Sequence, residues 1–174
     1  MFELTSPAFE PATDIPSDFT CDGADRSPAL VWTDPPRGTR SFALIMDDPD
    51  APRGTWVHWV IYDVPARERG LPEGAGSRGA LTPGARQGIN DFGRTGYGGP
   101  CPPPGSPHRY YFRLYALGAL LNLPPRATRA SVDRAMRGHV LATAEVFGRY
   151  QRRDGARHGE RGELIRSRVR KDNQ

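Results

Sequence analysis

Residues 41–65 read SFALIMDDPDAPRGTWVHWVIYDVP, and this stretch decides the fold. Two apolar runs, Ser41–Met46 and Trp56–Val64, flank a turn-rich insert that contains three aspartates and two prolines. Both runs are short and rich in β-branched and aromatic residues, a composition typical of strands. Because the second run is apolar at odd and even positions alike, we expect a strand that is buried on both faces.

The period-2 geometry of a strand divides the side chains of the second run between two faces. The two sets of alternate residues are expected on opposite faces: Trp56, His58, Val60 and Tyr62 against Val57, Trp59 and Ile61. An imidazole then lies in an apolar strand, shortly after an acidic turn. This combination predicts a small polar pocket set in an apolar wall.

The length of 174 residues and the composition predict one domain that is large enough to form a hydrophobic core. Twenty glycines and eighteen prolines favour many turns that join short strands. No apolar run reaches membrane-spanning length, and the start, MFELTSPAFEPATD, lacks the basic and apolar segments of a secretory signal. We therefore expect a cytoplasmic protein whose two cysteines stay reduced.

Positive charge is concentrated at the C-terminal end. The net charge is +4, but residues 1–148 carry −1 and residues 149–174 carry +5. A nucleic-acid-binding body is disfavoured, because its basic and acidic residues are balanced and form no basic stripe. We expect one domain over residues 1–150. Residues 151–174 are expected to form a basic polar tail, disordered or weakly helical and able to contact anionic membranes weakly.

Three further strands are predicted outside the opening stretch. Short apolar runs indicate an edge strand at Phe2–Ser6 and strands at Leu30–Thr33 and His108–Ala116. In the last of these, His108 and Tyr110 begin the row of side chains that faces the core.

One region has a helical pattern. Residues 128–147 carry apolar side chains at i, i+4 spacing: Val132, Met136, Val140, Ala144 and Phe147. Gly138 interrupts this stripe at a cost of about 1 kcal/mol relative to Ala. We therefore expect either one helix or two helices with a bend.

Three blocks of sequence, in order, resemble one known family. They are DDPDAP at residues 47–52, WVHWVIYDVP at residues 56–65 and GYGGPCPPPGSPHRYYFRLYAL at residues 96–117. Together they resemble the phosphatidylethanolamine-binding proteins, in particular the bacterial branch of Raf-kinase-inhibitor-like proteins. The resemblance extends over residues 2–150. It implies a mainly β domain of two antiparallel sheets packed as a sandwich, with one or two C-terminal helices.

The resemblance also implies a pocket for a small anion. The positions that match its ligand-binding residues are Asp48, His58, Gly99, His108 and Tyr110, and those that match its supporting wall are Asp50, Pro52, Trp56 and Cys101. Two imidazoles and a phenol supply hydrogen-bond donors, and a glycine lets a backbone N–H approach a ligand. A carboxylate beside a histidine favours the imidazolium but repels a dianion, so a monoanion or a protonated phosphate is expected.

The family likeness raises two further expectations about the walls of the pocket. It suggests a cis peptide bond in the insert Asp48–Pro52, at Ala51–Pro52. Cys21 and Cys101 both fall in turns on the pocket side of the family fold, which leaves contact between them open. A disulfide between them is not expected in the cytoplasm.

Three hypotheses of function follow. The first is a non-enzymatic protein that binds a small phosphorylated or anionic ligand, such as a phospholipid headgroup, in a regulatory role. The second is an inhibitor or modulator of a kinase or protease, and the third is a hydrolase that uses an Asp/His or Cys/His set. Catalysis is disfavoured, because prolines on both sides of Cys101 remove the N–H donors that an oxyanion hole needs.

No cofactor or metal is expected, since the four histidines and two cysteines are scattered without a paired ligand motif. A homodimer is left open, because some bacterial relatives are dimers.

Overall fold

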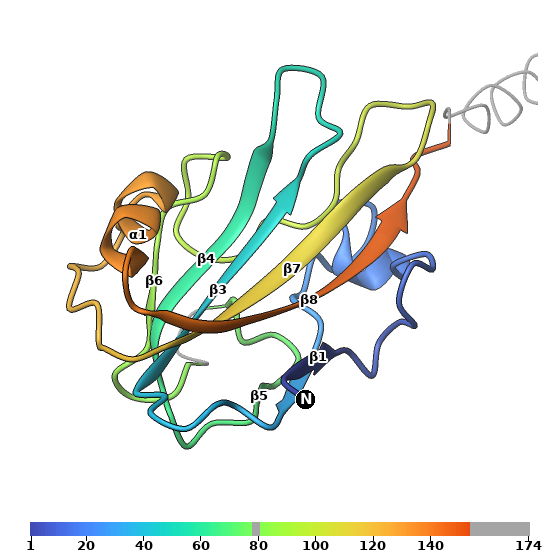
Figure 1. The fold of residues 1–174 in the computed structure, drawn as a ribbon. Helices are drawn as coiled ribbons and strands as arrows, with labels where there is room; N and C mark the ends of the chain where they lie inside the picture. Colours follow the sequence, from blue (N-terminus) through green and yellow to red (C-terminus); the bar gives the residue numbers. More distant parts are fainter. Residues whose placement is uncertain (78–80, 154–174) are drawn as a thin grey trace, which may run out of the picture.

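A computed structural model describes residues 1–77 and 81–153. Two antiparallel sheets face each other, as expected from the family likeness (Figure 1). The small sheet has the strand order β1 (Glu3–Thr5), β2 (Leu30–Thr33) and β5 (Gly70–Leu71). The large sheet has the order β6 (Arg86–Gln87), β4 (Trp56–Pro65), β3 (Ser41–Asp48), β7 (His108–Leu117) and β8 (Val140–Tyr150). Most of the predicted basic tail lies outside the described residues.

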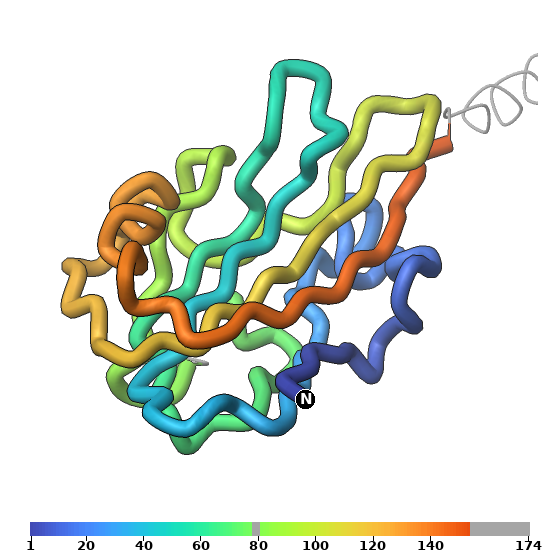
Figure 2. The backbone as a smooth tube through the Cα atoms, viewed as in Figure 1, coloured from blue at the N-terminus to red at the C-terminus, as the bar shows by residue number. Residues whose placement is uncertain are grey.

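The large sheet is covered on both faces. One hydrophobic cluster fills the space between the sheets and contains Trp32 and Phe112, among others. A second cluster lies between the large sheet and helix α1 (Arg129–Met136) and contains Ile45 and Val132. All eight residues of β3 are buried as a result. The central position of β3, between β4 and β7, is clear in the backbone trace (Figure 2).

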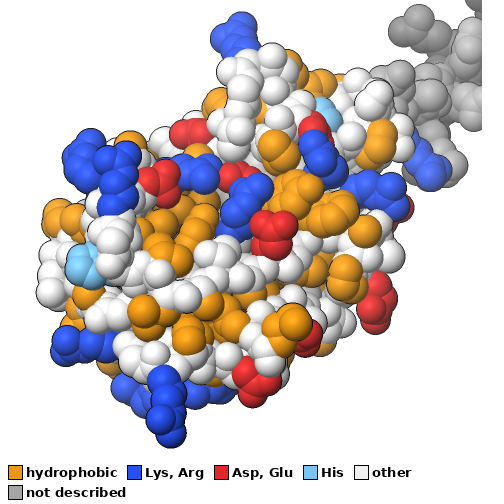
Figure 3. All heavy atoms as spheres, viewed as in Figure 1, with side chains coloured by type: hydrophobic (Ala, Val, Ile, Leu, Met, Phe, Trp, Pro, Cys, Tyr) orange, Lys and Arg blue, Asp and Glu red, His pale blue; other side chains and the backbone are white. Residues whose placement is uncertain are grey.

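On the face of the molecule shown in Figure 3, charged side chains lie among hydrophobic ones, and the contacts of Arg113 and Tyr111 show how they cover β7 and β8. Arg113 lies over the ring of Tyr111, 4.6 Å from its centroid, and Tyr111 stacks on Phe147. The same guanidinium forms an ion pair with Glu145 at 3.5 Å. These stems and rings cover the apolar surface of the sheet, and the Arg113 guanidinium also pairs with the buried Asp47 carboxylate.

A β-bulge changes the faces predicted for β4. Met46 pairs with Trp59 but Asp47 pairs with Val57, so His58 is an extra residue in the ladder. The predicted grouping of His58 with Val60 is therefore wrong. Val60 packs in the cluster beneath α1, whereas the His58 ring lies 5.2 Å from that of Tyr110, on the side of the small sheet. Bulges reorient side chains in this way.

The C-terminal region differs from the predicted helix over residues 128–147. Helix α1 begins after Thr128, whose Oγ1 accepts a hydrogen bond from the Ser131 N–H at 3.1 Å. The helix ends at Met136, and strand β8 follows from Val140. Only the first two residues of the predicted stripe, Val132 and Met136, share a buried helix face.

Strand formation beyond the helix has a non-local cause. Residues 140–150 pair with β7 along nearly its whole length. Their alternation buries Ala144 and Val146 between the sheets, whereas Val140 lies beyond a register shift and is 44% exposed. Gly148 lies inside β8, where it pairs with Tyr110. It packs so closely against Ile15 that a Cβ at this position would overlap that side chain.

The hairpin insert after β3 is held by its own polar groups. Asp48 Oδ1 accepts the N–H of Asp50 at 2.8 Å, and Ala51 O accepts the N–H of Gly54 at 3.1 Å. The described residues contain no cis peptide bond. The predicted cis bond at Ala51–Pro52 is therefore wrong, because the turn closes with trans peptides.

Replacing Gly138 by Ala distinguishes the observed end of the helix from a continuous one. In a continuous helix the change would stabilise the protein by about 1 kcal/mol, because Ala is the better helix former. Here Gly138 has a φ of +79°, and an added Cβ would meet no atom within 4 Å. We expect the strained backbone to cost about 1 kcal/mol in urea unfolding. A gain in stability would contradict the structure.

Candidate functional site

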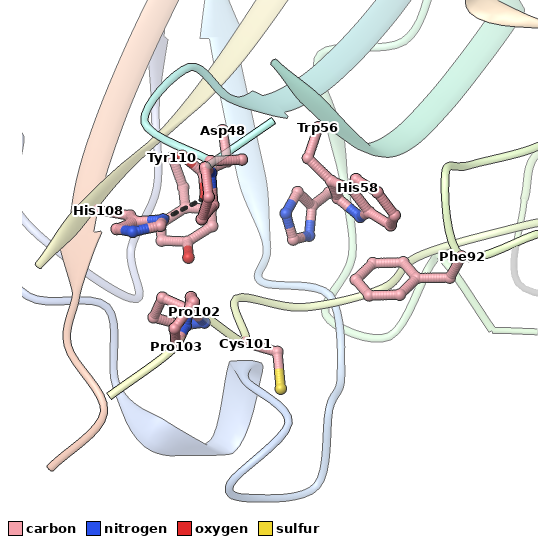
Figure 4. A pocket seen from close by; sticks show the side chains of 11 residues that line it. Asp48, Trp56, His58, Phe92, Cys101, Pro102, Pro103, His108 and Tyr110 are labelled. Carbon is pink, nitrogen blue, oxygen red and sulfur yellow. Dashed lines mark hydrogen bonds and ion pairs between the residues drawn. The ribbon is translucent and has the colours of Figure 1, made fainter. Parts of the chain in front are cut away.

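A cavity of about 190 Å³ opens at the end of the sandwich where the β3–β4 hairpin meets the loop before β7 (Figure 4). Asp48 ends β3, His58 is the bulged residue of β4, and His108 and Tyr110 begin β7. The complete lining consists of Asp48, Ala51, Pro52, Trp56, His58, Phe92, Cys101, Pro102, Pro103, His108 and Tyr110.

Asp48 and His108 form a buried pair. The His108 Nδ1–H donates to Asp48 Oδ2 at 2.7 Å, and both side chains are almost completely covered. Because a carboxylate can only accept here, the proton is on Nδ1 and the ring is fixed in one orientation. The Nε2 atom of His108 remains available to a ligand.

His58 is held by the backbone of the neighbouring loop. Its Nδ1–H donates to the Gly98 carbonyl at 2.6 Å, and the Gly98 N–H donates to the His58 carbonyl at 3.0 Å. Burial lowers the pKa of His58 below its ordinary value of 6.5. The neutral ring therefore has a lone pair on Nε2, which can accept a hydrogen bond from a ligand.

Tyr110 brings an unsatisfied hydroxyl to the cavity. Its Oη is the one buried side-chain polar atom without a hydrogen-bond partner among the described residues, and it points into the space between the labelled side chains (Figure 4). Burial, followed by the nearby Asp48 carboxylate, raises the pKa of Tyr110. The phenol stays protonated and is a donor. An orphaned buried hydroxyl costs about 1–3 kcal/mol, which a ligand oxygen would relieve.

The mouth of the cavity is apolar and aromatic. Trp56 and Phe92 meet edge to face with centroids 5.5 Å apart, and both remain 37% exposed. Phe92 also lies 5.2 Å from the His58 ring. An anion bound inside could therefore carry an apolar group that packs at the rim.

Four of the five predicted ligand-binding residues line the cavity, and Gly99 does not. The Gly99 N–H donates to Asp25 Oδ1 at 2.8 Å. A Cβ at this position would overlap that carboxylate and the Phe19 carbonyl. The structure thus gives Gly99 a packing role beside the site, where a backbone donor to the anion was expected.

Three predicted wall residues, Pro52, Trp56 and Cys101, line the cavity, and Asp50 lies outside it. The Asp50 carboxylate pairs with the Arg109 guanidinium at 2.8 Å and accepts the Arg109 backbone N–H at 2.9 Å. Hydrogen bonding to the Arg109 side chain lowers the pKa of Asp50 to about 2. Asp50 therefore ties the hairpin insert to the start of β7.

Cys21 and Cys101 form a disulfide with their Cα atoms 5.4 Å apart. The expectation of two reduced cysteines is therefore wrong for this structure. The two turns do meet at the pocket side, as the family likeness had left open. The sequence contains no local signal for the pairing, because 80 residues separate the two positions.

Several lining residues were not predicted from the sequence: Ala51, Phe92, Pro102 and Pro103. Phe92 belongs to a turn whose Asn90 Oδ1 accepts the N–H groups of Phe92 and Arg94. The Asn-Asp-Phe-Gly motif signals that turn, and an aromatic residue displayed on a tight turn could have indicated a rim. Among residues 1–77 and 81–153, no group of three His, Cys, Asp or Glu side chains could hold a metal ion.

The sequence model of one family, described as phosphatidylethanolamine-binding protein, matches residues 5–151. The chain belongs to this family. A UPF0098 protein of Aquifex aeolicus is 51% identical over 154 residues, which cover 87% of this chain and 90% of that protein. A UPF0098 protein of Methanothermobacter thermautotrophicus is 50% identical over 149 residues, which cover 86% of this chain and 98% of that protein.

Solved structures of the phosphatidylethanolamine-binding protein family have the same fold. YbcL of E. coli, described as a member of the mammalian family, has a TM-score of 0.83 and 36% identity over 87% of this chain and 99% of its own. The homologue CT736 of Chlamydia trachomatis has a TM-score of 0.80 and 40% identity over 87% of this chain and 97% of its own. The predicted family and mainly β fold are both confirmed. In the part of the chain that the structure describes, no helix is long and apolar enough to span a membrane.

The lowered pKa of His58 predicts a specific loss of stability in acid. The unfolded chain takes up a proton at this residue more readily than the folded chain. The stabilising contribution is thus complete above about pH 6.5 and declines as the pH falls towards the lower folded-state pKa. His58→Asn keeps an N–H donor near the Nδ1 position and cannot titrate.

We therefore expect the wild-type protein to lose more stability than His58→Asn when urea unfolding is compared at about pH 7.5 and about pH 5. Equal losses in the two proteins would show that burial does not hold the His58 pKa below its ordinary value.

Proposed function

We propose that this protein is a non-enzymatic receptor for a small singly charged phosphate compound, such as a phosphate monoester, with a regulatory role. The observation that carries the proposal is the unpartnered Tyr110 hydroxyl, directed into a cavity that His58 and His108 also line. A hydroxyl of this kind is satisfied when a ligand oxygen accepts its proton.

The pattern of donors and acceptors favours a protonated phosphate. Tyr110 donates, whereas neutral His58 accepts through Nε2, because its Nδ1–H is committed to Gly98. Asp48 keeps a negative charge nearby, which disfavours a dianion. A phosphate with one remaining P–OH can donate to His58 and accept from Tyr110 at the same time.

The apolar rim favours a substituted phosphate over the inorganic ion. Trp56 and Phe92 are partly exposed at the mouth, so an alkyl or aryl group on the ligand would bury surface against them. Hydrogen bonds that involve a charged group contribute about 1.5–3 kcal/mol each, but association and desolvation consume much of this. Inorganic phosphate should bind on the order of millimolar.

The chemistry of the lining supports binding without turnover. Cys101 is bonded to Cys21 and offers no thiolate as a nucleophile. The described residues that line the cavity include no serine, threonine or lysine. His108 and Asp48 are paired with each other, so the anion would meet groups that orient it.

Tyr110→Phe should weaken the binding of inorganic phosphate and of phosphoethanolamine about tenfold or more, because a hydrogen bond to a charged group is lost. Tyr111→Phe is the matched control, since its ring packs on Phe147 on the opposite face of β7. We expect this control to bind like the wild type in isothermal titration calorimetry. Equal affinities for Tyr110→Phe and Tyr111→Phe would refute the proposal.

Binding of a phosphate monoester should also weaken as the pH rises. The second pKa of a monoester is about 6, and above it the P–OH that His58 accepts is lost. The pKa of His58 lies below 6.5, so the ring stays neutral there and cannot compensate. Affinity for phosphoethanolamine should fall by up to about tenfold per pH unit above the second pKa of the ligand. An affinity that rises with pH would show that the pocket selects the dianion.

A further inference from the structure

We propose that the Cys21–Cys101 disulfide is a site of thiol–disulfide exchange that controls the geometry of the pocket and its affinity for an anion. The second half of this inference rests on the proposed function. The first half concerns the wall of the cavity, of which Cys101 is a part, and can be tested without a ligand.

The disulfide holds two irregular segments together. Cys21 follows the short 3₁₀ helix η1 (Ser17–Phe19), and Cys101 lies in the loop that leads into β7. Beside the disulfide, the Cys21 N–H donates to the Pro100 carbonyl at 3.1 Å. The Tyr97 hydroxyl donates to the Phe19 carbonyl at 2.7 Å. The turn after η1 is therefore bonded to the loop before β7 both covalently and by hydrogen bonds.

The same loop positions the polar groups of the site. The Gly98 carbonyl fixes the His58 ring through Nδ1 at 2.6 Å, three residues before the disulfide. Pro102 and Pro103, directly after Cys101, form one wall of the cavity. A displacement of Cys101 would therefore change the orientation of His58 and the width of the cavity together.

Backbone hydrogen bonds give this loop little support beside the disulfide, such as those from the Cys21 N–H to the Pro100 carbonyl at 3.1 Å and from the Gly105 N–H to the Arg152 carbonyl at 3.4 Å. Residues 100–107 contain five prolines, and proline has no N–H to donate. None of these eight residues belongs to a strand or helix. The disulfide to Cys21 is the covalent link that anchors this wall to the turn after η1.

Both cysteine residues are exposed to solvent, which places the disulfide at the surface, where a small thiol reductant can approach it. The thiolate of a dithiol reductant attacks one Sγ, breaks the Sγ–Sγ bond and forms a mixed disulfide, and the other cysteine leaves. The second thiolate of the reductant then displaces the first cysteine. Two electrons and the two protons of the reductant pass to Cys21 and Cys101, and the reductant becomes a disulfide.

Control of the pocket by this reaction must be reciprocal. If reduction weakens anion binding by some factor, a bound anion disfavours reduction by the same factor. For this two-electron couple a tenfold factor corresponds to about 30 mV. Bound phosphate should therefore protect the disulfide to the extent that the disulfide supports binding.

The experiment compares the full chain in its oxidised form and after reduction with dithiothreitol. Without ligand, the ring resonances of His58 in NMR spectra should shift on reduction, whereas those of exposed His139 should not. Inorganic phosphate should bind the reduced protein about tenfold more weakly, the loss expected for one misplaced hydrogen bond to a charged group. In dithiothreitol redox buffers, saturating phosphate should shift the reduction equilibrium by the same factor.

Cys21→Ser/Cys101→Ser is the matched variant. We expect it to bind phosphate like the reduced wild type and not to respond to dithiothreitol. Far-UV circular dichroism checks that the reduced wild type is folded at the assay temperature. The comparison of oxidised with reduced wild type then stands even if the variant does not fold.

Each outcome decides between the two claims. Unchanged His58 resonances and unchanged phosphate affinity after reduction would overturn the redox inference and leave the anion site intact. Oxidised protein that fails to bind phosphate, but whose His58 resonances still shift on reduction, would overturn the proposed function and support redox control of the pocket wall.

Discussion

The central strand β3 is buried on both faces, and this constraint determines what can be built at its end. The strand finishes with two carboxylates in succession, which must point to opposite faces, and both are nearly inaccessible to water. A buried charge without a partner is strongly destabilising. Asp47 is therefore paired with Arg113 and Arg129 on the helix side. On the side of the small sheet Asp48 is paired with His108, and that pairing begins the pocket.

The rest of the site follows from how neighbouring segments adapt to this end of β3. The bulge in β4 turns His58 towards the same side as Tyr110, and the loop before β7 supplies the Gly98 carbonyl that fixes the ring. Among the described residues, the Tyr110 hydroxyl is the one buried side-chain polar atom without a hydrogen-bond partner, and the hydrogen bonds of His58 and His108 engage their Nδ1 atoms, which leaves Nε2 of each ring for a ligand. A site that leaves a buried hydroxyl donor free is suited to binding, because a ligand can supply the missing acceptor.

The sequence predicts the parts of this arrangement that depend on local pattern. Leu30–Thr33 and the strands around the two apolar runs follow from composition and period, and the three family blocks indicate which side chains meet. The sequence does not predict the features that depend on contact with a distant segment of the chain. Residues 140–147 are predicted as helix from their local pattern, but pairing with β7 makes them part of a strand. The bulge at His58, the Asp25 partner of Gly99 and the disulfide across 80 residues also depend on contacts that no local pattern encodes.

A crystal structure of the oxidised protein soaked in inorganic phosphate tests the central claim most directly, because it shows where the ion binds and which atoms it contacts. We expect phosphate inside the cavity, with one oxygen within hydrogen-bond distance of the Tyr110 hydroxyl and another within hydrogen-bond distance of His58 Nε2. Phosphate bound only elsewhere, with the Tyr110 hydroxyl contacting water alone, would contradict it.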